Sequence, residues 1–319
     1  MSFDRFPDAL ILTGPTGSGK SRLALALAER LGAEIVAMDS MTLYRGMDVG
    51  TAKPTTADRR RVPHHLIDVL DPWQSASVAW WLEQAEVCYQ DITGRGKRAL
   101  FVGGTPLYLK ALLYGLFDGP PADAAVRRRL AAEAEEHGGA ALHRRLAEHD
   151  PAAAARLHPN DVRRMIRALE VWELTGRPIS SFQEQWKGAP GGAADRVLCL
   201  DVPRPELYAR IDTRVREMIA ASLVDEVRRL RAAPHPLGRE ASQAVGYKEL
   251  FDHLDGRATL DEAIDRIQTR SRQLAKRQLT WFRRLPCRPA SEELTFALWC
   301  GTITVDAASG GEGRGAALS

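Results

Sequence analysis

A glycine-rich segment near the N-terminus carries the residues best suited to chemistry. It reads GPTGSGKS over residues 14–21, between the apolar run ALIL and the helix-like run RLALALAERLG. Its spacing of glycine, lysine and serine fits the phosphate-loop pattern, in which successive backbone N–H groups face one anion at the start of a helix. In such a loop Lys20 neutralises terminal phosphate charge and the hydroxyl of Ser21 can hold Mg²⁺. The segment therefore predicts a phosphate-binding loop.

The loop alone does not define the reaction. A nucleotide hydrolase usually carries a strand that ends in Asp, which positions Mg²⁺ and water. Here the strand-like run ALFVGGT ends instead in Gly103, Gly104 and Thr105. The early strand-like run that does end in an acid is AEIVAMDS, which contains Asp39. From spacing alone, Asp39 could be a magnesium ligand, a catalytic base or an N-cap.

These residues need a scaffold, and the first third of the chain alternates strand-like with helix-like segments. Short apolar runs predict buried strands at 9–14, 33–40 and 98–104. Helical patterns follow at 19–31, 77–96 and 105–116, and Gly32 closes the first of them. Strands and helices that alternate at this spacing predict a parallel sheet covered on both faces.

A change of character near FDGPPAD, residues 117–123, predicts a second, all-helical domain. From there to a linker at 187–196, which is rich in Gly, Ala and Pro, only helical patterns occur. One of them, NDVRRMIRALEVWELTG, has Asn160 and Asp161 as cap residues at its start and Gly176 as its stop. The composition break therefore predicts a helical insertion.

After the linker the apolar run RVLCLDV predicts that the sheet resumes. The rest is helical up to TRSRQLAKRQLTWFRRLP, and TFALWCGTITV, residues 295–305, predicts a last strand. We expect an α/β fold with a P-loop NTPase-like core, whose parallel sheet is flanked by helices, plus an all-helical insertion domain. The expected parts are a first core part over 1–120, the insertion over 121–190, a second core part with basic C-terminal helices over 191–305, and a disordered tail over 306–319.

Composition limits the class of protein. The chain has 319 residues, of which 45% are hydrophobic and 27% charged, as is ordinary for a soluble globular protein. Its net charge of +3 is too small to demand a nucleic-acid partner. The four cysteines show no metal-binding spacing, which favours reduced thiols in a cytoplasmic protein. Since no run approaches the roughly 18 apolar residues of a membrane span, we expect no membrane partner.

Several longer motifs, taken in order, resemble the bacterial tRNA dimethylallyltransferases, also called tRNA isopentenyltransferases. They are GPTGSGKS, DSMTLYRGMDVGTAKP followed by PHHLIDVLDP, FVGGTPLYLKALLYGL, LHPNDVRRMIRALEV, VGYKEL and RQLAKRQLTWFRR, over about residues 10 to 285. Members of that family transfer a dimethylallyl group from dimethylallyl diphosphate to N6 of adenosine 37, beside the anticodon of tRNA. The resemblance implies that the loop holds a diphosphate leaving group rather than ATP, which would explain a phosphate loop without a clear acidic partner strand.

The resemblance also implies roles for individual residues. An adenine N6 amine is a poor nucleophile because its lone pair is delocalised into the ring, and Asp39 would accept its proton. Thr105 would line the channel in which donor and base meet, and the guanidinium of Arg214 would bind the diphosphate. The implied catalytic residues are Asp39, Thr105 and Arg214. The implied diphosphate-binding residues are Gly14, Thr16, Gly17, Ser18, Gly19, Lys20 and Ser21, with Ser21 as the ligand of Mg²⁺, the expected cofactor.

In that family the helical insertion grips the anticodon stem. Arg164 and Arg167 are three residues apart, so they would share a helical face. The implied tRNA-binding residues are Asp39, Ser40, Met41, Thr42, Thr105, Arg127, Arg163, Arg164, Arg167, Gln243 and Tyr247. Without the resemblance, the arginines of VRRMIRALEV could equally form a solvated face paired with Glu170 and Glu173. One departure is Ser222, where glycine is common in the family, and it leaves the local turn open.

Other functions stay open from the sequence. The loop alone favours a P-loop kinase of a small metabolite, and the same donor with a nucleotide acceptor would make an adenylate isopentenyltransferase. An RNA-binding protein with a vestigial loop is a further alternative, against which the intact phosphate loop and Asp39 argue. The arginines of the insertion and the basic C-terminal helix favour RNA over free AMP. The resemblance implies a monomeric enzyme whose partners are the tRNA anticodon stem-loop and dimethylallyl diphosphate, and we expect it in the cytoplasm.

Overall fold

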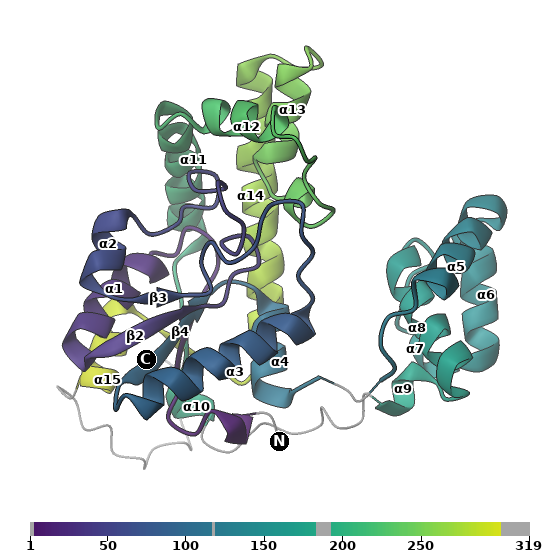
Figure 1. Ribbon diagram of the computed structural model, residues 1–319, viewed down its shortest axis with the longest axis horizontal. Coiled ribbons are helices and arrows are strands. Elements are labelled where there is room, and N and C mark those ends of the chain that lie inside the picture. The colour runs from purple at the N-terminus through teal and green to yellow at the C-terminus, as the bar shows by residue number, and fades with distance from the viewer. Residues whose placement is uncertain (1–2, 117–118, 183–192, 301–319) are drawn as a thin grey trace, which may run out of the picture. The chain divides into compact units, whose positions relative to one another are not determined.

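The computed structural model describes residues 3–116, 119–182 and 193–300, which form two compact units (Figure 1). The core unit comprises Met1–Leu113 and Pro190–Ser319, and the helical unit comprises Tyr114–Ala189. The proposed tail over 306–319 lies outside the described residues, as does most of the expected linker. At the end of that linker a short helix, α10 (Ala193–Arg196), leads directly into the sheet.

A six-stranded parallel sheet, in the order β3-β2-β4-β1-β5-β6, forms the centre of the described part of the core unit. The strands are β1 (Leu10–Thr13), β2 (Ala33–Ala37), β3 (His64–His65), β4 (Arg98–Gly103), β5 (Val197–Leu200) and β6 (Arg288–Ala290). The central strands are buried at nearly every position, as parallel strands covered on both faces must be. The α/β class with a parallel sheet is therefore confirmed.

The register of the sheet brings the predicted site segments to one edge. Thr13 of β1 aligns with Gly103 of β4, and Ala37 of β2 aligns with Val102. The chain leaves each of these strands at its carboxyl end, which parallel strands share. The phosphate loop, the turn that contains Asp39 and the β4–α4 junction therefore meet at the same edge.

Helices cover both faces of the sheet. One face packs against α1 (Lys20–Leu31) and α15 (Glu292–Cys300), and the other against α3 (Val78–Gly94), which also contacts α4 (Pro106–Tyr114) through stacked Trp81 and Tyr108 rings. The remaining helices of this unit are α2 (Thr56–Arg61), α11 (Arg204–Ala220), α12 (Leu223–Arg231), α13 (Tyr247–Leu254) and α14 (Leu260–Phe282), with short 3-10 turns at Phe3–Arg5 and Ala241–Gln243. Figure 1 shows α14 running from beside the sheet to α12 and α13.

The predicted last strand over 295–305 is wrong within the described residues. The strand that ends the sheet, β6, comes earlier, and residues 292–300 form α15, which packs on α1. Ser291 starts this helix, since its Oγ accepts a hydrogen bond from the N–H of Leu294. Periodicity cannot separate a short apolar strand from a short buried helix, which is why TFALWC was misassigned.

The predicted glycine stops are confirmed, whereas the predicted side-chain cap of α8 is not. Gly32 ends α1 in the left-handed conformation, with φ 61°, and Gly176 ends α8 in the same way, with φ 68°. Asp161 precedes α8 but its side chain caps no backbone N–H. Ser222, the residue before α12, has φ 69°, in the left-handed region that favours glycine.

The helical unit packs around its own core. Its helices are α5 (Ala124–His137), α6 (Gly139–His149), α7 (Pro151–Ala154), α8 (Val162–Thr175) and α9 (Ile179–Phe182). Leu130, Leu142 and Leu169 are fully buried at its centre. Between residues 119 and 182 every element is helical, as the composition break predicted. Throughout the described residues of both units, no helix is long and apolar enough to cross a bilayer.

Candidate active site at the carboxyl edge of the sheet

The carboxyl edge of the sheet opens into a cavity of about 780 Å³. Both parts of the core unit enclose it, because the phosphate loop and the ends of β2 and β4 come from the first part, whereas α11 and α14 come from the second. The predicted residues that line it are Thr16, Lys20, Ser21, Asp39, Ser40, Met41, Thr42, Thr105, Arg214 and Gln243. One cavity therefore gathers the predicted catalytic residues and most of the others from the core unit.

Glycines give the phosphate loop its shape. Gly17 and Gly19 have φ values of 81° and 91°, which L side chains rarely adopt. A Cβ added to Gly17 would lie 2.8 Å from Ile211 Cγ1, so space as well as backbone conformation requires glycine there. Gly14, Gly17, Ser18 and Gly19 do not themselves line the cavity. Helix α1 begins at Lys20, so the positive end of its dipole lies next to the loop.

Lys20 and Arg214 are two of the cationic residues that line the cavity. The Lys20 amine donates to the carbonyl of Pro15 at 3.3 Å, and burial lowers the pKa of Lys20 to about 8, aided by nearby Arg214 and opposed by the Asp39 carboxylate. Burial also lowers the pKa of Arg214. Among the described residues, no hydrogen bond or ion pair holds its guanidinium. Desolvated cations are costly unless paired, so the cavity favours an anion.

Asp39 forms a turn at the end of β2. Its Oδ1 accepts a hydrogen bond from the N–H of Met41 at 2.9 Å, while Oδ2 accepts none from the described residues. No helix begins here, so the N-cap alternative for Asp39 is wrong. The Oγ1 of Thr105 accepts from the N–H of Ser40 at 3.1 Å, and the N–H of Thr105 donates to the carbonyl of Met38 at 3.3 Å. Thr105 thus fastens the Asp39 turn to the end of β4.

The glycine pair that ends β4 permits a close approach between segments. A Cβ on Gly103 would lie 1.9 Å from the carbonyl oxygen of Met38, and one on Gly104 would lie 2.7 Å from Nε2 of Gln278. No larger residue fits at Gly103 without separating β2 from β4. The strand that lacked an acidic residue ends instead in a backbone contact that positions the Asp39 turn.

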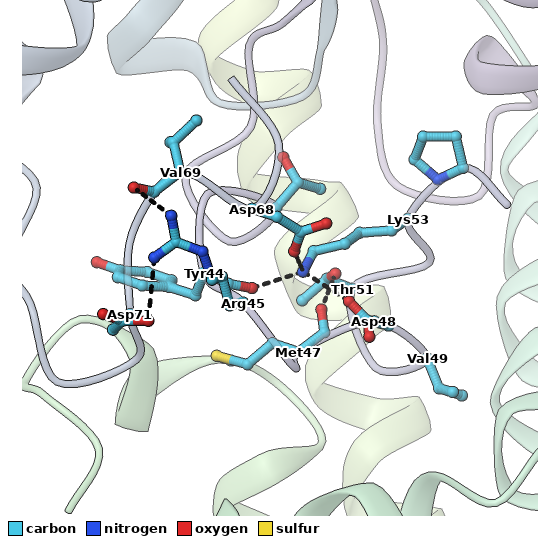
Figure 2. A network of polar contacts seen from close by, with 12 residues as sticks. Tyr44, Arg45, Met47, Asp48, Val49, Thr51, Lys53, Asp68, Val69 and Asp71 are labelled. Atoms are coloured by element: carbon cyan, nitrogen blue, oxygen red, sulfur yellow. Dashed lines mark hydrogen bonds and ion pairs between the residues drawn. The ribbon is translucent and has the colours of Figure 1, made fainter. Parts of the chain in front are cut away.

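The loop that follows Thr42 is tied down by a buried cation. Figure 2 shows Lys53, whose amine donates to the carbonyl of Tyr44 at 2.5 Å and to the carboxylates of Asp48 and Asp68 at 2.8 and 2.6 Å. The Lys53 side chain is only 2% exposed. Lys53 was not among the residues predicted for the site, although it lies within the motif DSMTLYRGMDVGTAKP.

A buried anion ties the same loop from the other side. Glu226 accepts hydrogen bonds from three successive N–H groups, those of residues 48–50, at 2.8 to 3.1 Å. It also accepts the hydroxyl of Tyr247 at 2.7 Å. Tyr247 is 0% exposed, so the prediction that its side chain contacts RNA is wrong in this structure. Gln243, in contrast, is exposed at the cavity rim.

Family models decide where this chain belongs. The IPP transferase model matches residues 42–285, and an isopentenyl transferase model matches residues 7–66. The chain belongs to the IPP transferase family. A tRNA dimethylallyltransferase of Geobacter metallireducens is 52% identical over 86% of this chain and 89% of that protein. One from Rhodopirellula baltica is 47% identical over 87% and 86%, respectively.

Solved structures agree with this membership of the IPP transferase family. The crystal structure of the full-length tRNA isopentenylpyrophosphate transferase from Bacillus halodurans has a TM-score of 0.64 and 41% identity, and covers 89% of this chain and 90% of that chain. A eukaryotic dimethylallyltransferase acting on tRNA has a TM-score of 0.71 and 29% identity, covering 86% and 70%. The P-loop NTPase-like core expected from the sequence is therefore confirmed as the fold of this family member.

The four arginines of the helical unit that were predicted to bind tRNA divide into two pairs. Glu170 is fully buried and accepts Arg127, at 2.8 and 3.0 Å, and Arg167, at 2.6 Å. The pairing that the sequence left open is thus confirmed for Arg167 with Glu170, whereas Glu173 pairs with Arg129 and Arg145 from α5 and α6. Arg163 is exposed and pairs with no described residue, and Arg164 is 64% exposed, 3.3 Å from Asp161. Only the second pair presents its charge mainly to solvent.

Proposed function

We propose that this chain is a tRNA dimethylallyltransferase, which transfers a dimethylallyl group from dimethylallyl diphosphate to N6 of adenosine 37 and releases diphosphate. The observation that carries the proposal is the cavity in which Lys20 and Arg214 face the carboxylate of Asp39. The cations suit a diphosphate and the carboxylate suits an amine. The relatives named tRNA dimethylallyltransferase support the same reaction class.

On the donor side the chain stabilises a leaving group. As the bond between the allylic carbon and the diphosphate oxygen breaks, its electron pair leaves with the diphosphate. Lys20, Arg214 and the N–H groups at the start of α1 stabilise this growing negative charge. Their effect is strong because little water screens them in the cavity. Thr16 would contribute from the loop itself.

On the acceptor side the chain takes up a proton. N6 of the adenine forms the new bond to the allylic carbon, and its proton passes to Asp39. The Oδ1 of Asp39 is fixed by the N–H of Met41, so Oδ2, which accepts no hydrogen bond within the described residues, is the atom that would receive it. Thr105 holds the turn in place from β4.

Mg²⁺ fits this cavity only if oxygen atoms of the bound dimethylallyl diphosphate complete its coordination. The hydroxyl of Ser21 and the carboxylate of Asp39 line the same space, and both are the hard oxygen donors that Mg²⁺ prefers. Within the described residues, no group of three or more His, Cys, Asp or Glu could hold a metal alone. When bound, the ion would neutralise diphosphate charge.

The acceptor reaches the site from the exposed side. Ser40, Met41, Thr42 and Gln243 line the cavity, and an unpaired loop base can be turned into such a pocket at modest cost. Arg163 and Arg164 present charge on the helical unit that would contact the RNA backbone. We also propose that the enzyme works as a monomer in the cytoplasm, where tRNA is modified.

The direct test offers the purified protein labelled dimethylallyl diphosphate and Mg²⁺ with three acceptors in parallel: unmodified tRNA, AMP, and a tRNA with guanosine at position 37. Label in the first alone supports the proposal. Label in AMP would assign the chain to nucleotide prenylation instead. ATP consumption without prenyl transfer would favour the kinase alternative. Asp39→Asn, which keeps the shape of the side chain, is the control and should lower transfer by about 100-fold or more.

A further inference from the structure

A buried glutamine joins the two halves of the site. Gln278 lies on α14 and is 7% exposed. Its Oε1 accepts a hydrogen bond from the N–H of Thr16 at 2.9 Å, and its Nε2 donates to the carbonyl of Gly104 at 2.7 Å. One side-chain amide therefore connects the phosphate loop to the end of β4, using both its acceptor and its donor.

The connection continues to the base. Gly104 is followed by Thr105, which holds the N–H of Ser40 through Oγ1 and the carbonyl of Met38 through its own N–H. Asp39 lies between those two residues. A hydrogen-bonded path thus runs from the loop that would hold the leaving group, through Gln278, to the turn that presents the base.

We propose that Gln278 is a positioning residue for prenyl transfer, whose amide sets the separation between the phosphate loop and the Asp39 turn. The inference rests on the proposed function. In a displacement, attack and departure occur on opposite sides of one carbon, so the leaving-group site and the base must keep a fixed spacing. A misplacement of about 1 Å can cost about 100-fold in rate.

The chemistry of the residue supports this role. The path needs an acceptor toward Thr16 and a donor toward Gly104 on one planar group, which an amide supplies and a carboxylate does not. The side chain is also close to Lys20, because a Cβ on Gly104 would lie 2.7 Å from Gln278 Nε2 and 3.3 Å from Lys20 Nζ. A negative charge at Gln278 would therefore act on the Lys20 amine as well as break the bond to Gly104.

The same helix provides a matched control. Gln268 lies on α14, is 6% exposed, and donates from Nε2 to the carbonyl of Asp212 at 3.1 Å. It does not line the cavity. Gln268→Met and Gln278→Met therefore remove buried amides from one helix, but only the second interrupts the path between the loop and the base.

The experiment measures kcat, KM for dimethylallyl diphosphate and Tm for the wild type, Gln278→Met, Gln278→Glu and Gln268→Met. We expect Gln278→Met to lower kcat by about 100-fold, with less than a tenfold change in KM, while Gln268→Met loses Tm without losing kcat. Gln278→Glu keeps the acceptor toward Thr16 and loses the donor toward Gly104. It should therefore lower kcat as well, again with less than a tenfold change in KM.

Distinct outcomes separate the two claims. Absence of transfer by the wild type would reject the proposed function itself. An active wild type with both methionine variants equally active would overturn the role of Gln278. So would failure of both Gln278 variants to fold while Gln268→Met folds, because that result makes the residue structural.

Discussion

The pH dependence of donor use follows from the Lys20 amine. Burial lowers the pKa of Lys20 to about 8, well below the ordinary value for lysine. The charged amine is the form that neutralises diphosphate. About nine tenths of the molecules carry it at pH 7, half at pH 8 and one tenth at pH 9. Since the pKa is lowered, the charge is present below pH 8 and is lost as the pH rises through that value.

This titration sets the size of the effect. If only the charged form uses the donor, kcat/KM for dimethylallyl diphosphate falls about fivefold between pH 8 and pH 9 and approaches a tenfold fall per pH unit above that. The groups facing Lys20 do not reproduce this loss. Arg214 keeps its charge because guanidinium does not deprotonate in this range, and the Cys199 thiol stays neutral because its hydrogen bond with Cys287 and burial raise its pKa.

The assay measures kcat/KM for the donor at saturating tRNA and constant ionic strength from about pH 7 to pH 9.5. Lys20→Arg is the control, because an arginine stays charged throughout, so its lower activity should be flat where the wild type declines. A wild-type profile that stays level through pH 9 would show that the charge of Lys20 does not limit use of the donor. An equal decline in Lys20→Arg would show that another group titrates.

Three further predictions concern the turn at Ser222, the buried carboxylate of Glu226 and the arginines of the helical unit. Ser222→Gly should stabilise the core unit by up to about 1 kcal/mol in urea unfolding, because φ 69° suits glycine, whereas Ala221→Gly at φ −84° should not. Glu226→Gln should cost about 2 kcal/mol and weaken tRNA binding, since an amide cannot accept three backbone N–H groups and a hydroxyl; normal stability would contradict this. Arg163→Ala should weaken tRNA binding and reduce its salt dependence without changing Tm. Arg127→Ala should lower Tm, because the buried carboxylate of Glu170 loses two of its hydrogen bonds. Equal effects of these two arginine variants on Tm would contradict the division between them.

Much of the fold could be predicted because its signals are local. The phosphate loop is a contiguous pattern of glycines, and the apolar runs of β1, β2 and β4 are short and bounded by helices. The break that separates the helical unit is visible in composition. The strand predicted at TFALWC was wrong because a short apolar run is compatible with either a buried strand or a buried helix. Only its packing on α1 decides between the two.

The site was predicted in its parts but not in its connections. Lys20 and Asp39 belong to motifs quoted for the resemblance, which also implied Arg214, and the cavity brings the three together. Gln278 was missed because its partner Thr16 is 262 residues away in the sequence. Tyr247 was assigned to RNA because the motif VGYKEL shows no sign that its hydroxyl faces a buried carboxylate. Such roles depend on packing between distant segments, which no local pattern contains.

Nucleoside analysis of the tRNA product shows directly whether the chain prenylates adenosine 37. Transfer RNA incubated with the protein, Mg²⁺ and dimethylallyl diphosphate is digested, and its nucleosides are weighed by mass spectrometry. We expect one dimethylallyl group on the base of adenosine 37, diphosphate released in equal amount, and loss of both with Asp39→Asn. A dimethylallyl group at another nucleoside, or an unchanged product yield with Asp39→Asn, would contradict it.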